Sequence, residues 1–452
     1  MDNILLIDYG STYTKVVAVD ISGPLLLGCA SAYTTVNTDV GEGLASALSE
    51  LECQTGKLDY NKRLACSSAA GGLRMIACGL APELTAKAAS MAVMGAGAKI
   101  IGLYSYELTE EDIDEITAKS PDILLLTGGT DGGNKKCIQH NAKMLADAPG
   151  EYPIIVAGNR NSGHEVLQLL KQRKTYLCDN VMPTVGTINI EPTRKKIREI
   201  FLERIVRAKG LSQTKSQRGG VLMPTPAAVL TATELLATET GDLVAIDVGG
   251  ATTDVYSVTN GAPRGSSVIY KGLPEPYVKR TVEGDIGMRC SAQGVIEAAG
   301  ITEVARLAGL SEKSVAEQVL ILTEHTDTLP ITTEQKALDF ALAAMAIKTA
   351  TLRHAGSMEE VYTTSGRALV QTGKDLTGVD TIVMTGGALL NTDRQSELTK
   401  HALYSDDQPQ SLRPKKAKLM VDKHYILAAM GLLSGYAPAV ALELMISNLL
   451  MR

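Results

Sequence analysis

Short apolar runs with the alternation of β-strands open the chain. Three of them follow one another at residues 3–9, 13–20 and 24–33, and a helical pattern covers residues 42–54. The same succession of three strand-like runs returns at residues 243–249, 253–259 and 266–270. This repetition predicts an α/β protein built from two similar halves.

Strand-like and helical patterns also alternate between these two halves. Strands are expected at residues 98–104, 122–127, 153–157 and 174–178, with helices at 109–119, 134–147 and 162–172. This βαβ rhythm is typical of parallel strands covered by helices. We therefore expect an α/β insertion over about residues 83–180. It would enlarge a first half whose opening order, three strands and then a helix, is typical of an RNase H-like unit.

Length and composition favour two lobes and narrow the possible functions. A single core stops growing near about 250–300 residues, and this chain has 452. A formal net charge of −6, no tryptophan and only two phenylalanines argue against a nucleic-acid partner, which needs a basic field and stacking surface. The seven cysteines are scattered without a CxxC pair, so reduced thiols are expected rather than an iron–sulfur cluster.

A cytoplasmic location is expected. Residues 1–10, MDNILLIDYG, run into a strand with an acidic residue inside it, instead of a charged segment followed by an apolar signal core. Residues 425–442 carry no formal charge over 18 positions, which approaches the length of a membrane span. Gly431, Gly435 and Pro438 interrupt this stretch and favour two packed helices, so no membrane association is expected.

The first candidate for chemistry is the strand–turn–strand segment at residues 7–15, IDYGSTYTK. Asp8 closes the first strand, and Gly10, Ser11 and Thr12 form the turn. Consecutive backbone N–H groups and hydroxyls at a hairpin tip can hold phosphate oxygens, and a carboxylate can hold a hydrated magnesium ion. The alternative for this motif alone is an ordinary tight turn with a solvated aspartate.

A second hairpin repeats this design at residues 245–258, AIDVGGATTDVYSV. Asp247 ends an apolar strand, and Gly249, Gly250, Thr252 and Thr253 follow it. Each hairpin alone can be a simple glycine-rich turn. Two of them, each opening a three-strand unit, favour opposed tips that grip one polyphosphate with a shared cation.

A third motif, TGGALL at residues 385–390, places a Gly-Gly turn between a buried strand and the start of a helix. Gly386, Gly387 and Ala388 would let a flat ring such as adenosine lie against the backbone. The alternative is a strand–helix turn of the kind that any α/β protein can contain.

These three motifs, in this order, resemble the first phosphate, second phosphate and adenosine motifs of the actin, sugar-kinase and heat-shock-chaperone ATPase superfamily. The resemblance implies two RNase H-like lobes with a central cleft for ATP and magnesium, and a catalytic set of Asp8, Asp247 and Thr252. The implied contacts are, for magnesium through water, Asp8 and Asp247; for the inner phosphates, Gly10, Ser11, Thr12 and Lys15; for the γ-phosphate, Gly249, Gly250, Thr252 and Thr253; and for adenosine, Gly386, Gly387 and Ala388.

The same resemblance implies lobe boundaries. The first lobe would span residues 1–224, with a C-terminal helix at 436–452 packing back on it, and the second lobe would span residues 225–435. The stretches PAAVLTAT at 226–233 and LAAMGLLSG at 427–435 resemble the two helices that cross between lobes. Small residues there allow the close approach that hinge or shear motion requires.

One departure from the superfamily pattern concerns the attacking water. Actin and chaperone relatives carry a carboxylate or amide near the start of the first crossing helix, whereas residues 223–226 read MPTP here. Glu283 and Asp285, in VEGDIGMR at 282–289, are candidates to replace it at the nucleotide, and charged loop-rim residues are the alternative. Because the carboxylate or amide is missing at residues 223–226, we expect slow ATP hydrolysis. ATP binding should survive, since phosphoryl transfer relies mainly on positioning and charge neutralisation rather than on a dedicated base.

Three strings resemble one branch of the superfamily, the glutamate mutase accessory family, often labelled MutL or GlmL and unrelated to mismatch-repair ATPases. They are ACSSAAGGL at 65–73, TGGTDGG at 127–133 and VEGDIGMR at 282–289. The resemblance implies an ATP-driven reactivating factor for an adenosylcobalamin-dependent mutase or aminomutase, with no covalently held cobalamin of its own. The partner surface is hypothesised to lie in the insertion. A small-molecule kinase, an iron–sulfur radical-dehydratase activator and an actin-like filament protein are the alternatives.

Overall fold

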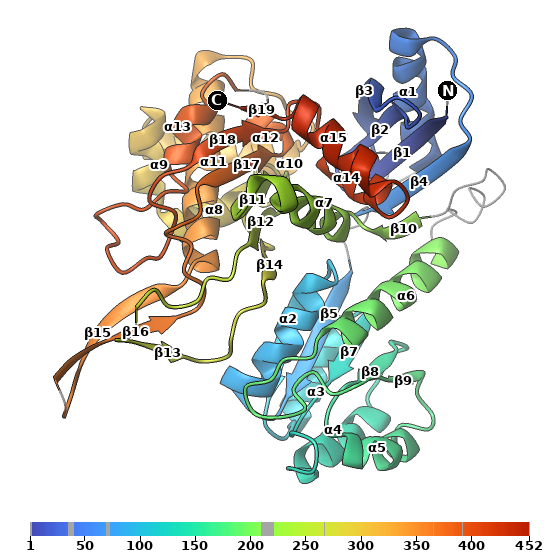
Figure 1. The fold of residues 1–452 in the computed structure, drawn as a ribbon, viewed down its shortest axis with the longest axis vertical. Coiled ribbons are helices and arrows are strands. Elements are labelled where there is room, and N and C mark those ends of the chain that lie inside the picture. Colours follow the sequence, from blue (N-terminus) through green and yellow to red (C-terminus); the bar gives the residue numbers. More distant parts are fainter. Residues whose placement is uncertain are drawn as a thin grey trace. The chain divides into compact units, whose positions relative to one another are not determined.

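The structure is a computed structural model that describes residues 2–34, 40–68, 73–208, 221–265, 267–364, 366–390 and 392–451 (Figure 1). Part of the ACSSAAGGL string at 65–73 lies outside these described residues. The chain forms two compact units. The first comprises Met1–Ala69, Ala228–Lys271 and Glu275–Arg452, and the second comprises Ala70–Ala227 and Gly272–Pro274.

The first sheet of the first unit begins at the N-terminus. Strand β1 pairs antiparallel with β2 and parallel with β4, and β2 pairs antiparallel with β3. Every residue of β1 is buried, so both faces of this sheet are covered; α1 packs against β2 and β3, and α14 packs against β1 and β4. The elements are β1 Asn3–Tyr9, β2 Tyr13–Asp20, β3 Leu25–Tyr33, α1 Val40–Thr55, β4 Lys62–Ser67 and α14 Leu427–Ser434.

The second sheet of the first unit repeats this topology. Its strand order is β14-β12-β11-β17-β18-β19, and β11 pairs antiparallel with β12 and parallel with β17, as β1 does with β2 and β4. The strands are β11 Leu243–Val248, β12 Thr253–Val258, β14 Val278–Glu283, β17 Thr381–Thr385, β18 Lys418–Val421 and β19 Leu450–Met451. The predicted fold class, α/β with two RNase H-like halves, is confirmed by this repetition.

One strand of the second half was predicted wrongly. The third strand of the sheet is β14, and the expected segment at 266–270 is instead β13, Val268–Lys271, of a separate three-stranded sheet. There β13 pairs parallel with β16, Gly366–Thr372, which pairs antiparallel with β15, Ser357–Thr363. Tertiary pairing makes the difference: β14 pairs with β12, whereas β13, which has alternating exposed positions, pairs with β16.

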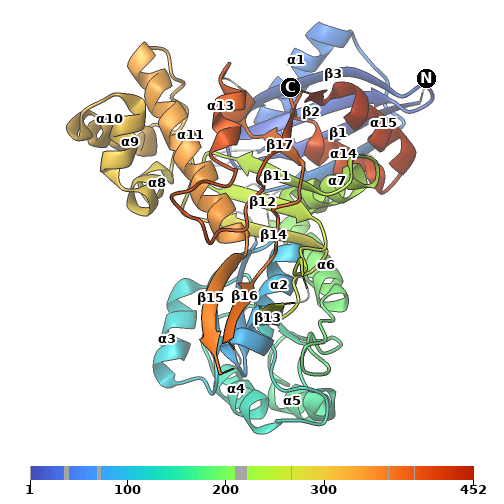
Figure 2. The same ribbon diagram turned by 60° about the vertical axis from the view of Figure 1, so that its left-hand side comes forward.

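Four helices lie together beside strands β11 and β12 in Figure 2. Their apolar residues form one core with the strands β11, β12, β17 and β18. The longest, α11, contacts β11, β12, β14, α8 and α9. The helices are α8 Ala292–Ala299, α9 Ile301–Ala308, α10 Glu312–Glu324 and α11 Thr333–His354; the shorter α12, Gly387–Leu390, and α13, Gln395–Lys400, follow later in the chain.

The second unit is a parallel α/β layer, as the βαβ rhythm predicted. Its strand order is β6-β5-β7-β8-β9, and every pairing is parallel. The strands are β5 Arg74–Gly79, β6 Lys99–Ser105, β7 Ile123–Leu126, β8 Ile154–Val156 and β9 Thr175–Leu177. The helices are the π-helix Pro82–Ala86, α2 Lys87–Gly95, α3 Glu110–Lys119, α4 Lys136–Ala146, the 3-10 helix Arg160–Ser162, α5 Gly163–Leu169 and α6 Glu191–Ala208.

Two helices bring small residues together within the first unit. Strand β10, Val221–Pro224, leads into α7, Thr225–Thr240, and α14 is followed by α15, Pro438–Asn448. A Cβ atom added to Gly431 of α14 would lie 1.9 Å from the carbonyl oxygen of Ala228 in α7, so a side chain has no room there. Among the described residues, no helix is both long and apolar enough to cross a membrane. The predicted lobe boundaries stay a prediction.

Candidate nucleotide-binding site

The first hairpin tip joins β1 to β2. Asp8 is buried and lies opposite Lys15 in the ladder; the Lys15 Nζ is 3.4 Å from Asp8 Oδ2, and the Cys66 thiol donates to Asp8 Oδ1 at 3.4 Å. The Gly10 N–H donates to the Tyr13 carbonyl at 3.2 Å, and an added Cβ would lie 2.4 Å from that oxygen. Only glycine fits this turn without a shift of the backbone.

The two polar residues at this tip remain accessible. Ser11 is exposed and Thr12 is half-buried. The Thr12 carbonyl accepts the N–H of Thr34 at 2.8 Å, which ties the tip to the end of β3. The Ser11 and Thr12 hydroxyls are therefore carried by a backbone that a hydrogen bond to Thr34 holds in place.

The second tip joins β11 to β12 in the same way. The Gly249 N–H donates to the Thr252 carbonyl at 2.9 Å. Asp247 lies opposite Asp254 in the ladder, and the Thr252 hydroxyl donates to Asp254 Oδ2 at 3.1 Å. Asp254 is buried and accepts two hydrogen bonds from the Arg280 guanidinium, at 2.7 and 2.8 Å. Asp254 thus anchors the tip, whereas Asp247 accepts a hydrogen bond from the Tyr425 hydroxyl.

The structure brings the two tips together. A Cβ atom on Gly250 would lie 3.3 Å from Thr12 Oγ1. The Lys15 Nζ lies 3.4 Å from the ring centroid of Tyr425, and the Tyr425 hydroxyl donates to Asp247 Oδ1 at 3.4 Å. Asp8, Lys15, Tyr425 and Asp247 therefore form one continuous series of contacts between the two halves of the first unit.

The Gly-Gly turn after β17 lies against the second tip. Gly386 has φ +107°, and an added Cβ would lie 2.4 Å from the Val248 carbonyl oxygen and 2.9 Å from Asp247 Oδ1. Gly387 is exposed, with no atom within 4 Å of a Cβ built there, and Ala388 is half-buried. Backbone that is close to Asp247 on one side and open above Gly387 suits a flat ligand. All three sequence motifs thus meet at one place.

Negative charge accumulates at this meeting point. Burial, then the neighbouring Asp254 carboxylate, raise the pKa of Asp247 to about 7, with Asp8 and Asp422 adding to the rise and Lys15 opposing it. Carboxylate oxygens in an environment short of positive charge are a donor set that magnesium fits. The described residues include no group of three His, Cys, Asp or Glu side chains that could form a direct metal cage. Magnesium commonly keeps several waters and takes only one or two carboxylates.

The sequence analysis missed two residues at the site. Asp422 is fully buried, and its carboxylate accepts the N–H groups of Ile426 and Leu427, at 2.8 and 3.1 Å, and the Thr385 hydroxyl at 3.0 Å. It therefore fixes the start of α14 beside the Gly386 turn. An aspartate directly after an apolar strand and shortly before a helix was the available signal. Tyr425 has φ +55°, and no sequence pattern points to it.

Glu283 and Asp285 occupy the edge of the second sheet. Glu283 lies opposite Thr253 in the ladder and is ion-paired with Arg353, and burial raises its pKa. Asp285 is exposed in the turn that follows. The Thr253 hydroxyl donates to the Ile286 carbonyl at 3.0 Å and is buried. The roles predicted for these residues at the nucleotide stay predictions.

Among solved structures, the chain is similar to an acetone carboxylase in its nucleotide-free form, with a TM-score of 0.44 and 13% identity over 95% of this chain and 70% of that one. Component A of (R)-2-hydroxyglutaryl-CoA dehydratase from Acidaminococcus fermentans is similar with a TM-score of 0.34 and 12% identity, over 98% of this chain and 99% of that one. Gluconate kinase from Lactobacillus acidophilus is similar with a TM-score of 0.36 and 11% identity, over 100% of this chain and 92% of that one. With TM-scores below 0.5, none of these likenesses bears on the function of this chain.

The sequence comparisons are far more specific. The chain is 44% identical over 455 residues to the protein MutL of Clostridium tetanomorphum, covering 98% of each of the two chains. The family model described as MutL protein matches residues 4–449. These matches confirm the family resemblance found in the sequence: the chain belongs to the MutL protein family.

Proposed function

We propose that this protein is a magnesium-dependent, ATP-binding reactivating factor for an adenosylcobalamin-dependent mutase or aminomutase. The observation that carries the ATP-binding part is the contact series from Asp8 through Lys15 and Tyr425 to Asp247, which joins two hairpin tips of the same design. Membership of the MutL protein family and the resemblance to the glutamate mutase accessory family support the client.

The residues of the first hairpin tip, together with Asp247, would contact the magnesium ion and the inner phosphates of the nucleotide. Bound magnesium would supply charge neutralisation for the phosphates, held through water by Asp8 and Asp247. The exposed turn of the first tip would hold the inner phosphates with its N–H groups and the hydroxyls of Ser11 and Thr12. Lys15 would leave the face of the Tyr425 ring to contact a phosphate oxygen.

The second tip and the Gly386 turn would complete the site. The Gly250 N–H would receive the γ-phosphate, together with the Thr252 hydroxyl once it turns away from Asp254. The Gly249 N–H and the Thr253 hydroxyl already donate to the Thr252 and Ile286 carbonyls, so both would shape the turn instead. Gly386, Gly387 and Ala388 would support the adenosine. Since residues 223–226 hold no carboxylate or amide to orient water, hydrolysis would be slow.

Closure of the two halves around ATP would drive a conformational change in the client enzyme. The tight crossing of α7 and α14 at Ala228 and Gly431 allows shear of one helix past the other. A client that binds the open and closed forms with different affinity would receive that difference as a conformational change. Release of a damaged cobalamin from the mutase would be the outcome.

The experiment is recovery of a mutase inactivated with hydroxocobalamin. The inactive enzyme is mixed with this protein, fresh adenosylcobalamin and magnesium ATP, and turnover is followed. Recovery with ATP, but not with a non-hydrolysable analogue, is expected. Absence of recovery with every mutase and aminomutase offered, together with phosphate transfer to a sugar, acid or alcohol, would replace the proposal with a small-molecule kinase.

A further inference from the structure

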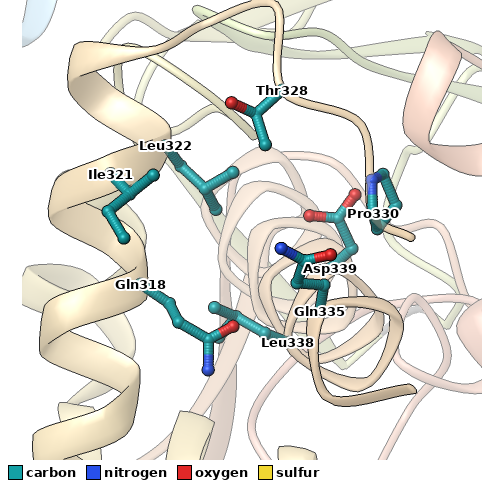
Figure 3. A pocket seen from close by; sticks show the side chains of 8 residues that line it. All are labelled: Gln318, Ile321, Leu322, Thr328, Pro330, Gln335, Leu338 and Asp339. Carbon is teal, nitrogen blue, oxygen red and sulfur yellow. The ribbon is translucent and has the colours of Figure 1, made fainter. Parts of the chain in front are cut away.

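A pocket lies between the C-terminal half of α10, the connection that follows and the start of α11 (Figure 3). In Figure 3, Ile321 and Leu322 project from one helix toward Leu338 and Gln335 of the other, and Pro330 closes one side. The full lining is Gln318, Ile321, Leu322, Thr328, Pro330, Gln335, Leu338 and Asp339. None of these residues belongs to the hairpin tips.

Four large aliphatic residues in this stretch of the chain are exposed; Ile321 lines the pocket, and the other three are next to lining residues in the sequence. Leu320 is 59% and Ile321 49% exposed on α10, and Leu329 is 58% and Ile331 81% exposed on either side of Pro330. Single exposed apolar residues are normal on a protein surface, whereas four within twelve residues, one of them lining a pocket, indicate an interaction site. We call these four residues and the pocket the α10–α11 surface.

The charge around the α10–α11 surface is negative. Residues 312–336 contain five acidic residues and two lysines. Glu324 and Asp327, both exposed, lie in and just before the connection that carries Leu329 and Ile331. An occupant that complements this surface has an apolar stripe flanked by lysine or arginine, which is the pattern of an amphipathic basic helix bound in a groove.

Arg289 links this surface to the second hairpin tip. Its backbone N–H donates to the Gly250 carbonyl at 2.8 Å. Its guanidinium donates to both carboxylate oxygens of Asp339, at 3.0 and 3.2 Å, and to the Thr328 carbonyl at 3.0 Å. Asp339 and Thr328 both line the pocket. A displacement of the second hairpin tip would therefore be transmitted through Arg289 to Asp339 and Thr328, two residues that line the pocket.

We propose that the α10–α11 surface binds a basic amphipathic helix of the client protein, as a second contact beside the partner surface hypothesised in the insertion over about residues 83–180, and that Arg289 couples its occupancy to the nucleotide at the second tip. The coupling rests on the proposed ATP site, and the identity of the occupant as the client rests on the proposed function, whereas the docking of a basic helix rests on neither. The two parts therefore fail in separate experiments.

Docking is tested by fluorescence anisotropy with a labelled 14-residue helix of leucine and lysine, and with the same peptide carrying glutamate in place of lysine. The lysine peptide is expected to bind at least about tenfold more tightly. The double variant Ile321→Ser, Leu329→Ser is expected to weaken it about tenfold or more. The matched control, Tyr362→Ser, Ile446→Ser, removes residues that are 84% and 49% exposed elsewhere and leaves the affinity unchanged.

Three outcomes would overturn the docking part. Equal affinity for the two peptides contradicts the charge argument, and an unchanged affinity in the Ile321, Leu329 variant contradicts the location. Concentration-dependent self-association in sedimentation, abolished by that same variant, would make a second copy of this chain the occupant instead of a client helix.

The coupling part is tested by repeating the titration with saturating magnesium ATP. The peptide affinity of the wild-type protein is expected to change about fivefold or more. Arg289→Lys keeps the charge but not the forked geometry, so it is expected to bind peptide without this change. An affinity insensitive to nucleotide in a protein that calorimetry shows to bind ATP would refute the coupling alone. Failure to bind ATP would refute the proposed function and the coupling together, and it would leave the docking of a basic helix standing.

Discussion

The two hairpins share one backbone design and differ in charge. In the first, Asp8 faces the cation of Lys15 across the ladder, whereas in the second, Asp247 faces the carboxylate of Asp254. Arg280 engages Asp254, and the pKa of Asp247 is raised to about 7 by burial and by its neighbours. The two hairpins thus place their carboxylates at equivalent positions but surround them with different charges. The excess of negative charge at the second tip is what a cation shared by the two tips would offset.

The largest effect on this comparison is expected from Arg280→Met. Arg280 and Asp254 are both buried, with side chains 3% and 8% exposed, so the variant leaves a carboxylate without its partner. We expect a loss of about 3–5 kcal/mol in the free energy of unfolding, measured with urea.

The matched change in the first hairpin is Lys15→Met. The Lys15 side chain is 19% exposed and its Nζ lies 3.4 Å from the Asp8 carboxylate, so this ion pair is longer and its cation more exposed to solvent than in the Arg280–Asp254 pair. A loss of about 1 kcal/mol or less is expected. Equal losses in the two variants would mean that the charge difference between the hairpins has no structural consequence.

A smaller difference is expected between the first glycines of the two turns. A Cβ on Gly10 would lie 2.4 Å from the Tyr13 carbonyl, whereas one on Gly249 would lie 3.2 Å from the Thr252 carbonyl. Gly10→Ala is expected to cost about 1–3 kcal/mol, because the backbone must shift. Gly249→Ala should stay within about 1 kcal/mol of the wild type. Thermal and urea unfolding would check both, and a more damaging Gly249→Ala would reverse the order.

A further effect, spread over a range of pH, concerns the second sheet. Burial lowers the pKa of His354 well below its usual value, and its two ring nitrogens lie 2.8 Å from the Ser257 hydroxyl and 2.7 Å from the Thr281 hydroxyl. Below pH 6.5 the unfolded chain binds a proton that the folded chain does not, so stability falls as pH falls.

The slope is at most about 1.4 kcal/mol per pH unit. His354→Gln should be less stable than the wild type at pH 7.5, and its difference from the wild type should shrink between pH 6.5 and 5. A constant difference over this range would show that His354 does not titrate as its burial requires.

Much of the fold could be read from the sequence, because the core strands are short apolar runs bounded by turn residues. The segments 3–9 and 13–20 coincide with β1 and β2, and the repeated design of the two tips placed Asp8 and Asp247 at equivalent positions. The third strand of the second half was placed too early. Residues 268–271 and 278–283 both suit a strand, and only tertiary pairing decides which one joins β12.

The residues that connect the tips could not be read from the sequence. Tyr425 reaches Asp247 through a backbone conformation with positive φ, which a tyrosine rarely adopts and no local pattern encodes. The link from Arg289 to Asp339 joins positions 50 residues apart, and it depends on how α11 packs. Local patterns located the carboxylates, and long-range packing determined their neighbours.

The most direct test of the account is a calorimetric titration of magnesium ATP into the wild type, Asp8→Asn, Asp247→Asn and the double variant. If both carboxylates serve one metal–nucleotide, each single variant loses at least about tenfold in affinity, equivalent to about 1.4 kcal/mol. The double variant then loses less than the sum of the two, because the sites are coupled. An ATP affinity unchanged after both substitutions would contradict the central claim.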